Sequence, residues 1–405
     1  MESDPMKKKL ITYAVAAAIF APLTAQAGTT LYGRLDISAN AWDTQTSSAA
    51  NGSFPGANFN LRGLNMMRGN NVDMLSNDSV VGLKGSEALG NGLQAIYKVE
   101  WGIDPTCTFG ASNNGSCQNT PGSNNGSVNG SVYGREQWLG LQSASFGSVT
   151  FGTVLTPYAY TGSLVDPMYN TALQARNFGM ESALQNDMSG EDGQAFANKS
   201  LRFTSAKIMG FQVLGHYTLH TNQAAGISGH DTWSAGLLYD QGPVLAYGNY
   251  MTNGAGGKDR AYKFGAKIDL SSFVSGMAVY GQWERDGGLI SRSFGVSASG
   301  ALVAPASALA QNNLNVNGGD TWFTGASYGL GNATLVAEYG QGNDSRNAGG
   351  VDVGNNTKTY LVGAKYAFGQ RTFAYGGWAR VASNNEALSG IKHIDTITVG
   401  MQHSF

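Results

Sequence analysis

The sequence predicts an all-β protein, a closed antiparallel transmembrane β-barrel of about sixteen strands. Short segments alternate apolar and polar residues along the chain, and their connections alternate between short and long. Beyond residue 27 no run of about 18 apolar residues could form a spanning helix, which leaves a closed barrel as the way to cross a bilayer. Glycine contributes 57 of 405 residues and charged residues only 13%, against about 25% in ordinary soluble proteins.

The N-terminus has the features of a cleaved export signal. Three lysines at 7–9 precede an apolar stretch at 10–23, and the small-x-small pattern at 25–27 suits a signal peptidase. We therefore expect residues 1–27 to be a signal peptide, with 1–5 as an upstream extension. The remaining residues, 28–405, should form the barrel domain.

The first and last segments show the alternation most clearly. In the first, Leu31, Gly33, Leu35, Ile37 and Ala39 share one face, and the other carries Tyr32, Arg34, Asp36, Ser38 and Asn40. In the last, the apolar face holds Ile397, Val399, Met401 and Phe405, and the polar face Thr396, Thr398, Gly400 and Gln402. In a transmembrane barrel the apolar face meets lipid and the polar face meets the lumen.

Connection lengths favour such a barrel over a soluble sandwich. The tight turns, expected on the periplasmic side, run from Glu87 to Gly92, Ser143 to Gly147, Ala206 to Gly210, Asp240 to Gly242, Ser271 to Ser275, Gly329 to Gly331 and Gly369 to Gln370. The long connections, expected to be extracellular, lie near 43–77, 104–130, 155–198, 219–231, 252–260, 286–319, 342–357 and 382–394. This strict alternation closes an even-stranded barrel, and the lack of a fixed repeat period argues against a β-helix.

Aromatic residues gather near strand ends, where the interfacial girdles of membrane barrels form. They include Tyr158, Tyr160, Trp233, Trp283, Trp322, Tyr366, Phe368 and Phe405. A sugar channel would need a continuous inward aromatic track. The strand pattern instead places a scattered set inward, namely Tyr32, Trp42, Tyr280 and Trp378.

The longest connection, at about 155–198, contains a stretch from Thr171 to Gln185 with helix-forming residues and helical spacing of apolar ones. A structureless surface loop would not need that pattern. The connection is long enough to fold back into a lumen wide enough for water.

Six segments resemble the general porins of the Gram-negative outer membrane, in the form common in β-proteobacteria. They are LYGRLDISAN at 31–40, VGLKGSEALGNGLQAIYKVEWG at 81–102, REQWLGLQSASFGSVTFGTVLTP at 135–157, KSLRFTS at 199–205, YLVGAKYAFGQRTFAYGGWARV at 360–381 and VGMQHSF at 399–405. The resemblance spans the mature chain. It implies a homotrimer in the outer membrane, in contact with lipid and lipopolysaccharide, that lets small hydrophilic solutes and ions diffuse passively. It also implies that Phe405 ends a strand recognised by the outer-membrane assembly machinery.

The resemblance further implies that the connection at 155–198 is a constriction loop facing basic residues across the pore. Its acidic side would be Asp166, Glu181, Asp187 and Glu191, and its basic side Arg34, Arg135 and Arg202. Alternation adds Lys98 and Arg380 to the inward polar face. Val80 and Thr153 stand where the family often has Arg, so we hypothesise a mild cation preference.

Enzymatic and metal-dependent functions find little support. The histidines are His216, His220, His230, His393 and His403, none of them in a catalytic motif. His216 and His220, with His230 or Asp231, would be a weak metal set, so no metal or cofactor is expected. A net charge of −2 lacks the basic excess that nucleic-acid binding needs. The alternatives to a general pore are a selective sugar or anion channel and a non-transport barrel, either adhesin or lipase.

The two cysteines, Cys107 and Cys117, are predicted to form a disulfide within one long loop of this exported chain. Closing so short a ring should stabilise the fold by about 2–3 kcal/mol on the chain-entropy account, with little effect on transport. Mass spectrometry of unreduced, alkylated protein should show neither cysteine modified. Two alkylated thiols would refute the bond.

Overall fold

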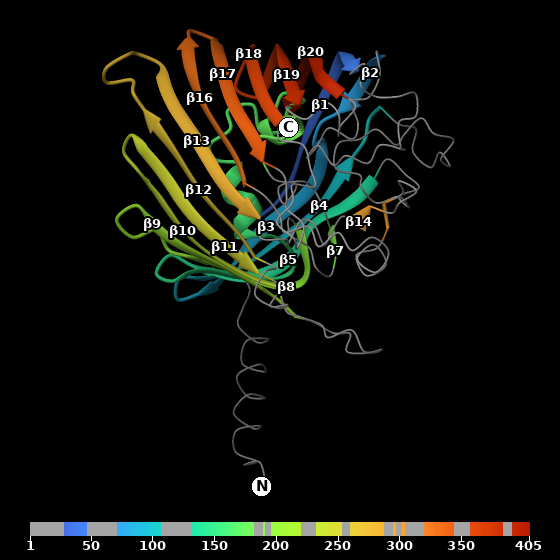
Figure 1. The fold of residues 1–405 in the computed structure, drawn as a ribbon. Helices are drawn as coiled ribbons and strands as arrows, with labels where there is room; N and C mark the ends of the chain where they lie inside the picture. The colour runs from blue at the N-terminus through green and yellow to red at the C-terminus, as the bar shows by residue number, and fades with distance from the viewer. Residues whose placement is uncertain are drawn as a thin grey trace, which may run out of the picture.

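In the computed structural model the chain folds into a closed antiparallel β-barrel (Figure 1). The described residues are 28–46, 71–106, 132–181, 189–190, 196–219, 232–252, 260–286, 295–296, 302–303, 320–343, 357–383 and 391–405. The predicted signal peptide and both cysteines lie outside these ranges.

Within the described residues, sixteen strands make the barrel wall, as the alternation predicted. They are β1 (Gly28–Thr46), β3 (Val80–Gly90), β4 (Leu93–Ile103), β5 (Val132–Ser143), β6 (Gly147–Leu155), β8 (Phe196–Ser205), β9 (Phe211–Thr218), β10 (Trp233–Gln241), β11 (Val244–Thr252), β12 (Arg260–Asp269), β13 (Met277–Asp286), β16 (Asp320–Leu330), β17 (Ala333–Asn343), β18 (Thr357–Ala367), β19 (Thr372–Ser383) and β20 (Ile391–Ser404). The shorter strands are β2 (Asn71–Ser76), β7 (Ser189–Gly190), β14 (Gly295–Val296) and β15 (Leu302–Val303).

Closure comes from β1, which pairs with β20 along most of its length, from Arg34 opposite Ser404 to Thr46 opposite Ile391. On its other side β1 pairs first with β3 and then with β2. These two strands are halves of one wall strand, interrupted at 77–79, where Asp78 adopts a positive φ of 53°. The interruption at 77–79 places the polar side chains of these residues on the inner side of the wall.

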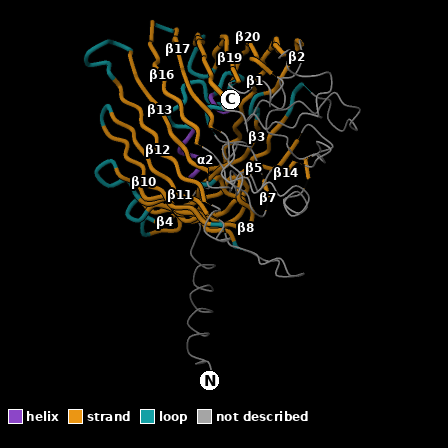
Figure 2. Tube along the Cα trace, viewed as in Figure 1, coloured by secondary structure: helices purple, strands orange, loops and turns teal. Residues whose placement is uncertain are grey.

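The strand bounds show that short and long connections alternate along the chain as predicted. Figure 2 draws the described turns and loops in teal. The β3–β4 turn shows how the sequence sets the short ones, because Asn91 and Gly92 have φ values of 51° and 75°. Positive φ at both central residues defines the type I′ turn, whose twist matches that of the flanking strands. This chemistry fixes the register of the hairpin.

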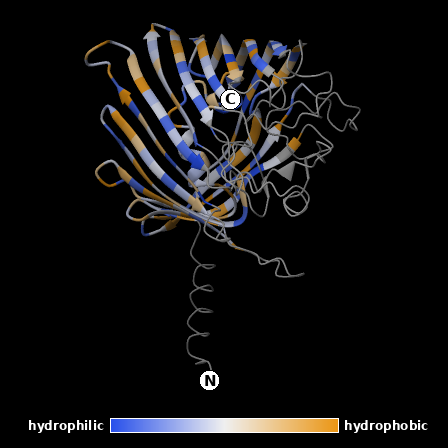
Figure 3. Cartoon of the chain, in the orientation of Figure 1, coloured by the Kyte–Doolittle hydropathy of each residue, from blue (hydrophilic) through white to orange (hydrophobic). Residues whose placement is uncertain are grey.

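The predicted faces of the first and last strands are confirmed (Figure 3). Ile397 and Val399 point outward and are more than half exposed. Asp36 points inward and is fully buried, since Tyr375, Asn77 and Gln402 all donate to its carboxylate at 2.6–2.9 Å. A polar cluster therefore lines the seam where the barrel closes.

The aromatic girdle is confirmed for Trp233, Trp283 and Trp322, which face outward near the loop ends of their strands and contact neighbouring rings. The assignment was wrong for Tyr158 and Tyr160. These two residues belong to the helix α2 (Pro157–Gly162), and Tyr158 is fully buried inside the barrel.

The predicted inward placement of Trp378 and Arg380 was also wrong. Trp378 pairs with the outward Ile397, and Arg380 forms a bidentate ion pair with Asp395 on the outer face. The inward positions of β19 are instead mostly apolar, and include Tyr375, Ala379 and Val381. Apolar residues face the lumen here because another segment packs on them.

Two helices are described, α2 and the 3-10 helix η2 (Ala175–Phe178). Within the described part of the chain, no helix has the length and apolar character needed to cross a membrane.

The last residue seals the barrel seam. Gly33 and Phe405 exchange two backbone hydrogen bonds of 3.0 Å, and a Cβ at Gly33 would lie 2.3 Å from the Phe405 ring. We expect deletion of Phe405, or the change Gly33→Val, to lower the yield of heat-modifiable protein in the outer membrane. Gly28→Val is the matched control, because a Cβ at Gly28 meets nothing within 4 Å. Wild-type yield from both test variants would contradict this role.

Candidate functional site

The candidate site is built around residues 156–181, which follow β6 in the long connection to β8. These residues lie inside the barrel and are called the inner loop below. The Thr156 side chain caps α2 by accepting from the Ala159 N–H at 3.2 Å, and Pro157 occupies the first turn. Gly179 ends η2 with a φ of 74°, a conformation that favours glycine. Within the described residues, the helical stretch expected from Thr171 onward is limited to η2.

The helix α2 packs on the inner face of β9 to β12. Asn249 donates to the Thr161 hydroxyl at 2.6 Å, and the Tyr158 hydroxyl donates to Glu284 at 3.2 Å. The Lys263 ammonium lies 4.2 Å from the centre of the Tyr158 ring, a cation–π distance. Polar and aromatic contacts thus fix the start of the inner loop.

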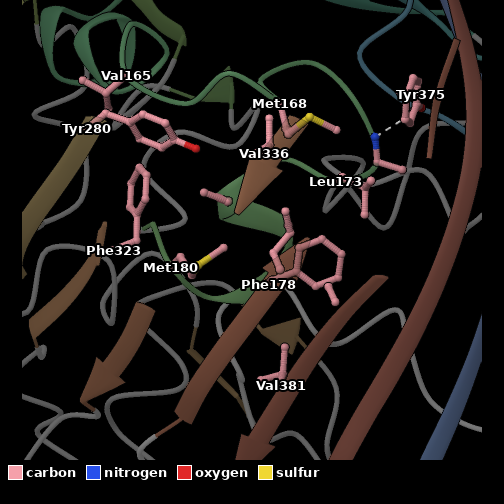
Figure 4. Close-up of a cluster of buried hydrophobic side chains, with 14 of the residues drawn as sticks. Val165, Met168, Leu173, Phe178, Met180, Tyr280, Phe323, Val336, Tyr375 and Val381 are labelled. Atoms are coloured by element: carbon pink, nitrogen blue, oxygen red, sulfur yellow. Dashed lines mark hydrogen bonds between the residues drawn. The ribbon is translucent and has the colours of Figure 1, made fainter. Parts of the chain in front are cut away.

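An apolar cluster fixes the rest of the inner loop (Figure 4). From the loop come Val165, Met168, Leu173, Phe178 and Met180, and from the wall Tyr280, Phe323, Val336, Tyr375 and Val381. Gly340 allows the close approach, since a Cβ there would lie 2.6 Å from the Met180 side chain. Full burial of a side chain such as Phe178 contributes about 1.5–3 kcal/mol.

Wall side chains also satisfy the backbone of the inner loop. Thr359 donates to the Phe178 carbonyl at 2.7 Å, and Thr321 donates to the Gly179 carbonyl at 3.0 Å. Gln402 donates to the Asn170 carbonyl at 2.9 Å, while the N–H of Ala172 donates to the Tyr375 hydroxyl. Buried backbone groups need such partners, so the inner loop and the wall form one hydrogen-bonded unit.

The two described acidic residues of the predicted constriction are buried. Asp166 is 5% exposed and accepts from the N–H groups of Met168 and Ala175 at 2.7 and 2.8 Å, while Glu181 is 1% exposed. Burial raises the pKa of Asp166, and those two N–H groups oppose the rise. Burial, and then the nearby Asp166 charge, raises the pKa of Glu181 well above its usual range. Asp187 and Glu191 lie outside the described residues.

The predicted basic residues meet acidic partners in one network on β4, β5 and β8, called the wall network below. Glu136 binds both Lys98 and Arg202, the latter at 2.8 Å. Glu100 binds Lys98 at 3.0 Å and Arg135 at 2.9 Å. The carboxylates are nearly buried, whereas the Lys98 and Arg202 side chains are 19% and 20% exposed. The two cations are thus the more accessible members of the network.

Asp78 joins the wall network to the inner loop. Its carboxylate forms ion pairs with Arg135, at 3.4 Å, and with Arg176 of η2. Its backbone carbonyl accepts from Arg34 at 2.6 Å. The interruption between β2 and β3 therefore places one carboxylate between the barrel wall and the docked loop.

Alternation alone did not predict Glu136 as a network member. Arg135 and Glu136 are consecutive and should face opposite sides of the sheet. A β-bulge between Val99 and Trp101 sets both of them against Glu100, so both reach the network. The two positions expected to carry Arg take no part in the ion pairs: Val80 is buried, and Thr153 hydrogen-bonds Asn198.

His216, the described member of the weak metal set, is buried and hydrogen-bonded to Thr218 and Ser234. Within the described ranges, no group of three or more His, Cys, Asp or Glu residues is placed to hold a metal ion. His220, His230 and Asp231 fall outside those ranges.

A closed barrel with an apolar outside, charged groups inside and a loop docked against its inner wall defines a channel protein of the outer membrane. A sequence model described as Gram-negative porin matches residues 14–386. The chain belongs to this family, and it is an outer-membrane channel for passive diffusion.

Individual relatives and solved structures are consistent with membership of this family. An outer membrane porin protein of Bordetella pertussis is 26% identical, over 99% of this chain and 100% of that protein. The major outer membrane protein P.IB of Neisseria gonorrhoeae is 25% identical over 92% and 93%. Among solved structures, an anion-selective porin from Comamonas acidovorans has a TM-score of 0.61 at 16% identity, covering 94% of this chain and 100% of its own. OmpF of Salmonella typhi has a TM-score of 0.58 at 14% identity, covering 93% and 97%.

The apolar cluster should control how firmly the inner loop is held. We expect Phe178→Ala to increase current fluctuations in single-channel recordings and hydrogen exchange across 165–181, because a buried Phe→Ala change costs about 3–5 kcal/mol. Tyr160→Ala, on the same loop but 41% exposed, is the matched control. Equal behaviour of the two variants would show that the cluster does not hold the loop.

Proposed function

We propose that the chain is a general diffusion pore for small hydrophilic solutes and ions, narrowed by the connection between β6 and β8. The supporting observation is the inner loop itself, docked on the inner wall and tied through Arg176 to the wall network. The solute path would run past the accessible cations Lys98 and Arg202. Asp187 and Glu191 stay part of the proposed constriction.

A sugar-selective channel fits less well. Two inward aromatic residues expected from the sequence, Trp42 and Tyr280, are buried at 7% and 4% exposure. Tyr32 donates its hydroxyl to Glu100 and is engaged in the wall network. Within the described residues, these three therefore offer no continuous track on which sugar rings could stack.

We assign ion selectivity to the wall network. There the cations Lys98, Arg135, Arg202 and Arg176 are largely, though not fully, compensated by the three carboxylates of Asp78, Glu100 and Glu136. The burial of Asp166 and Glu181 removes these two loop carboxylates from direct contact with permeating ions. Compensated charges in a narrow passage favour weak selectivity over strong anion or cation preference.

We propose that the pore assembles as a homotrimer through the outer face of β20, β1, β2 and β3. This face carries exposed aliphatic side chains, including Leu31, Val72, Met74, Ile397 and Val399. β1, β2 and β3 carry no aromatic residue at their outward positions. Among the structural neighbours, OmpT of Vibrio cholerae is recorded in a trimer form. We also propose that the outer-membrane assembly machinery recognises the C-terminal strand, β20.

Planar-bilayer recordings test the trimeric pore and the assignment of its ion selectivity to the wall network. Purified protein should give large conductance steps grouped in threes and a small zero-current potential across a salt gradient. Glu136→Gln should shift that potential toward anion preference, because it leaves Lys98 and Arg202 less compensated.

Asp240→Asn is the control for that measurement, since Asp240 forms an exposed ion pair with Lys207 at the short-turn end. An absence of conductance would sink the pore proposal. An unchanged potential for Glu136→Gln would sink the assignment of selectivity to the wall network.

A further inference from the structure

Buried carboxylates gather where the inner loop meets the barrel wall. The loop contributes Asp166 and Glu181, and the wall contributes Glu284 of β13 and Glu338 of β17; these four are called the carboxylate cluster below. Each is at most 5% exposed. The charge of Asp166 acts on both Glu181 and Glu338, and that of Glu284 acts on Glu181. Buried carboxylates are costly to ionise unless cations or hydrogen bonds compensate them, so the groups facing the cluster decide its charge.

Glu338 shows most clearly that donors are scarce. Its Oε1 atom accepts from the Tyr280 hydroxyl at 2.8 Å, across Gly325, which lies between the two residues in the sheet register. A Cβ at Gly325 would lie 2.7 Å from that hydroxyl, so the contact depends on glycine. Within the described residues no protein group donates to the other oxygen, Oε2, although it is buried. A buried carboxyl with so few donors favours its neutral, protonated form.

Lys263 of β12 is the first cation that faces the cluster. It is fully buried and lies directly opposite Glu284 in the β12–β13 register. Its charge also acts on Glu181, so one ammonium serves two carboxylates. Arg176 of the inner loop lies nearby, but it forms an ion pair with Asp78. Lys263 therefore compensates about half of the charge that it faces.

Lys365 of β18 is the second cation. Its ammonium donates to the carbonyl of Pro167 in the inner loop, and Lys267 of β12 repels it. The carboxylates that its charge reaches are Asp166, Glu338 and Asp36 of β1. The other titratable groups on this surface are hydroxyl donors, namely Tyr158, Tyr247, Tyr280 and Tyr375. Lys365 thus serves more carboxylates than it can neutralise.

Carboxylates outnumber cations at this junction. Within the described residues, the four carboxylates of the cluster face two lysines, so full ionisation would leave negative charge buried without compensation. Such charge is strongly unfavourable inside a protein. Burial, and then the charge of Asp166, raises the pKa of Glu181 well above its usual range, in agreement with this balance. The docked loop is therefore most stable when protons neutralise part of the cluster.

We propose that the carboxylate cluster is a proton-binding site that holds the inner loop docked, and that the loop loosens as the pH rises. Undocking exposes Asp166 and Glu181 to lumen water, where carboxyls titrate in their ordinary range. The proton is then a ligand that binds the docked state more tightly than the undocked one.

The sign of the effect follows from this difference. At acidic pH both states carry the protons, so docking is strongest there. It weakens as the pH rises from the ordinary carboxyl range through the raised pKa of Glu181. The effect of this site on transport rests on the proposed function, because a loosened loop widens the pore only if the docked loop narrows it.

The test measures hydrogen exchange across residues 165–181 of the full-length protein, from about pH 5 to about pH 9. Protection is taken relative to the intrinsic exchange rate at each pH, and strand β16 serves as an internal reference. Within the titration window, protection of the loop should fall by about tenfold per pH unit for one proton released on undocking. Protection of β16 should stay constant.

Three variants separate the proton site from other causes. Glu181→Gln with Glu338→Gln mimics the protonated cluster, and its loop protection should be nearly independent of pH. Asp240→Asn with Asp269→Asn removes two exposed carboxylates at the short-turn end and is the matched control, expected to keep the wild-type pH dependence. Phe178→Ala should lower protection at every pH yet keep that dependence. If the first double variant does not migrate as heat-modifiable protein, Glu181→Gln alone should make the dependence shallower.

Constant loop protection in the wild type over this pH range would overturn the proposal. An equally steep pH dependence in the Glu181→Gln and Glu338→Gln variant would also overturn it. Single-channel conductance over the same range tests the narrowing of the pore separately. A conductance that rises as protection falls supports both the proton site and the narrowing. Loss of protection at constant conductance would support the proton site and contradict the narrowing.

Discussion

The packing of an apolar loop surface against the inner wall of a membrane barrel is the interaction on which the site depends. A water-filled lumen would normally be lined with polar side chains, and an apolar patch there would be costly to hydrate. Phe178, Leu173 and Met180 remove that cost by covering the patch. The covered part of the wall includes the inward face of β19. The position of the inner loop therefore determines which strands present apolar side chains to the inside of the barrel.

Ion pairs hold the inner loop to the wall in addition to the apolar packing. Asp78 links the inner loop to the wall through Arg176 and Arg135, while Glu100 and Glu136 hold the remaining cations of the wall network. Removing one member of this nearly buried network would leave the charge of its partner uncompensated, which is costly. Each ion pair of the network therefore depends on the others. In the proposed pore, the same compensation would limit the electrostatic field that a permeating ion meets, so the proposed constriction and its proposed weak selectivity would have one origin.

The sequence alone predicted the barrel well, because strand alternation and connection length are local signals. Turn chemistry such as that of Asn91 and Gly92 needs no tertiary information. The pattern failed where tertiary packing reversed it. The pattern placed Trp378 and Arg380 inward because it assumes that the inward face of β19 lines a water-filled lumen and is polar. It placed Tyr158 in a girdle because that residue closely follows a strand. Glu136 was missed since a β-bulge cannot be read from period-two alternation. The burial of Asp166 depends on the fold of its own loop, which the residue type does not reveal.

The docked inner loop is proposed to narrow the pore. Replacing residues 163–180 with a short Gly-Ser linker, and measuring the largest neutral polymer that then enters the channel, tests this proposal. A sixteen-stranded barrel without its inner loop retains a wide aqueous lumen. The size limit and the single-channel conductance should therefore both rise, in a barrel that still migrates as heat-modifiable protein. An unchanged size limit in such a barrel would show that the constriction lies elsewhere and would contradict the account.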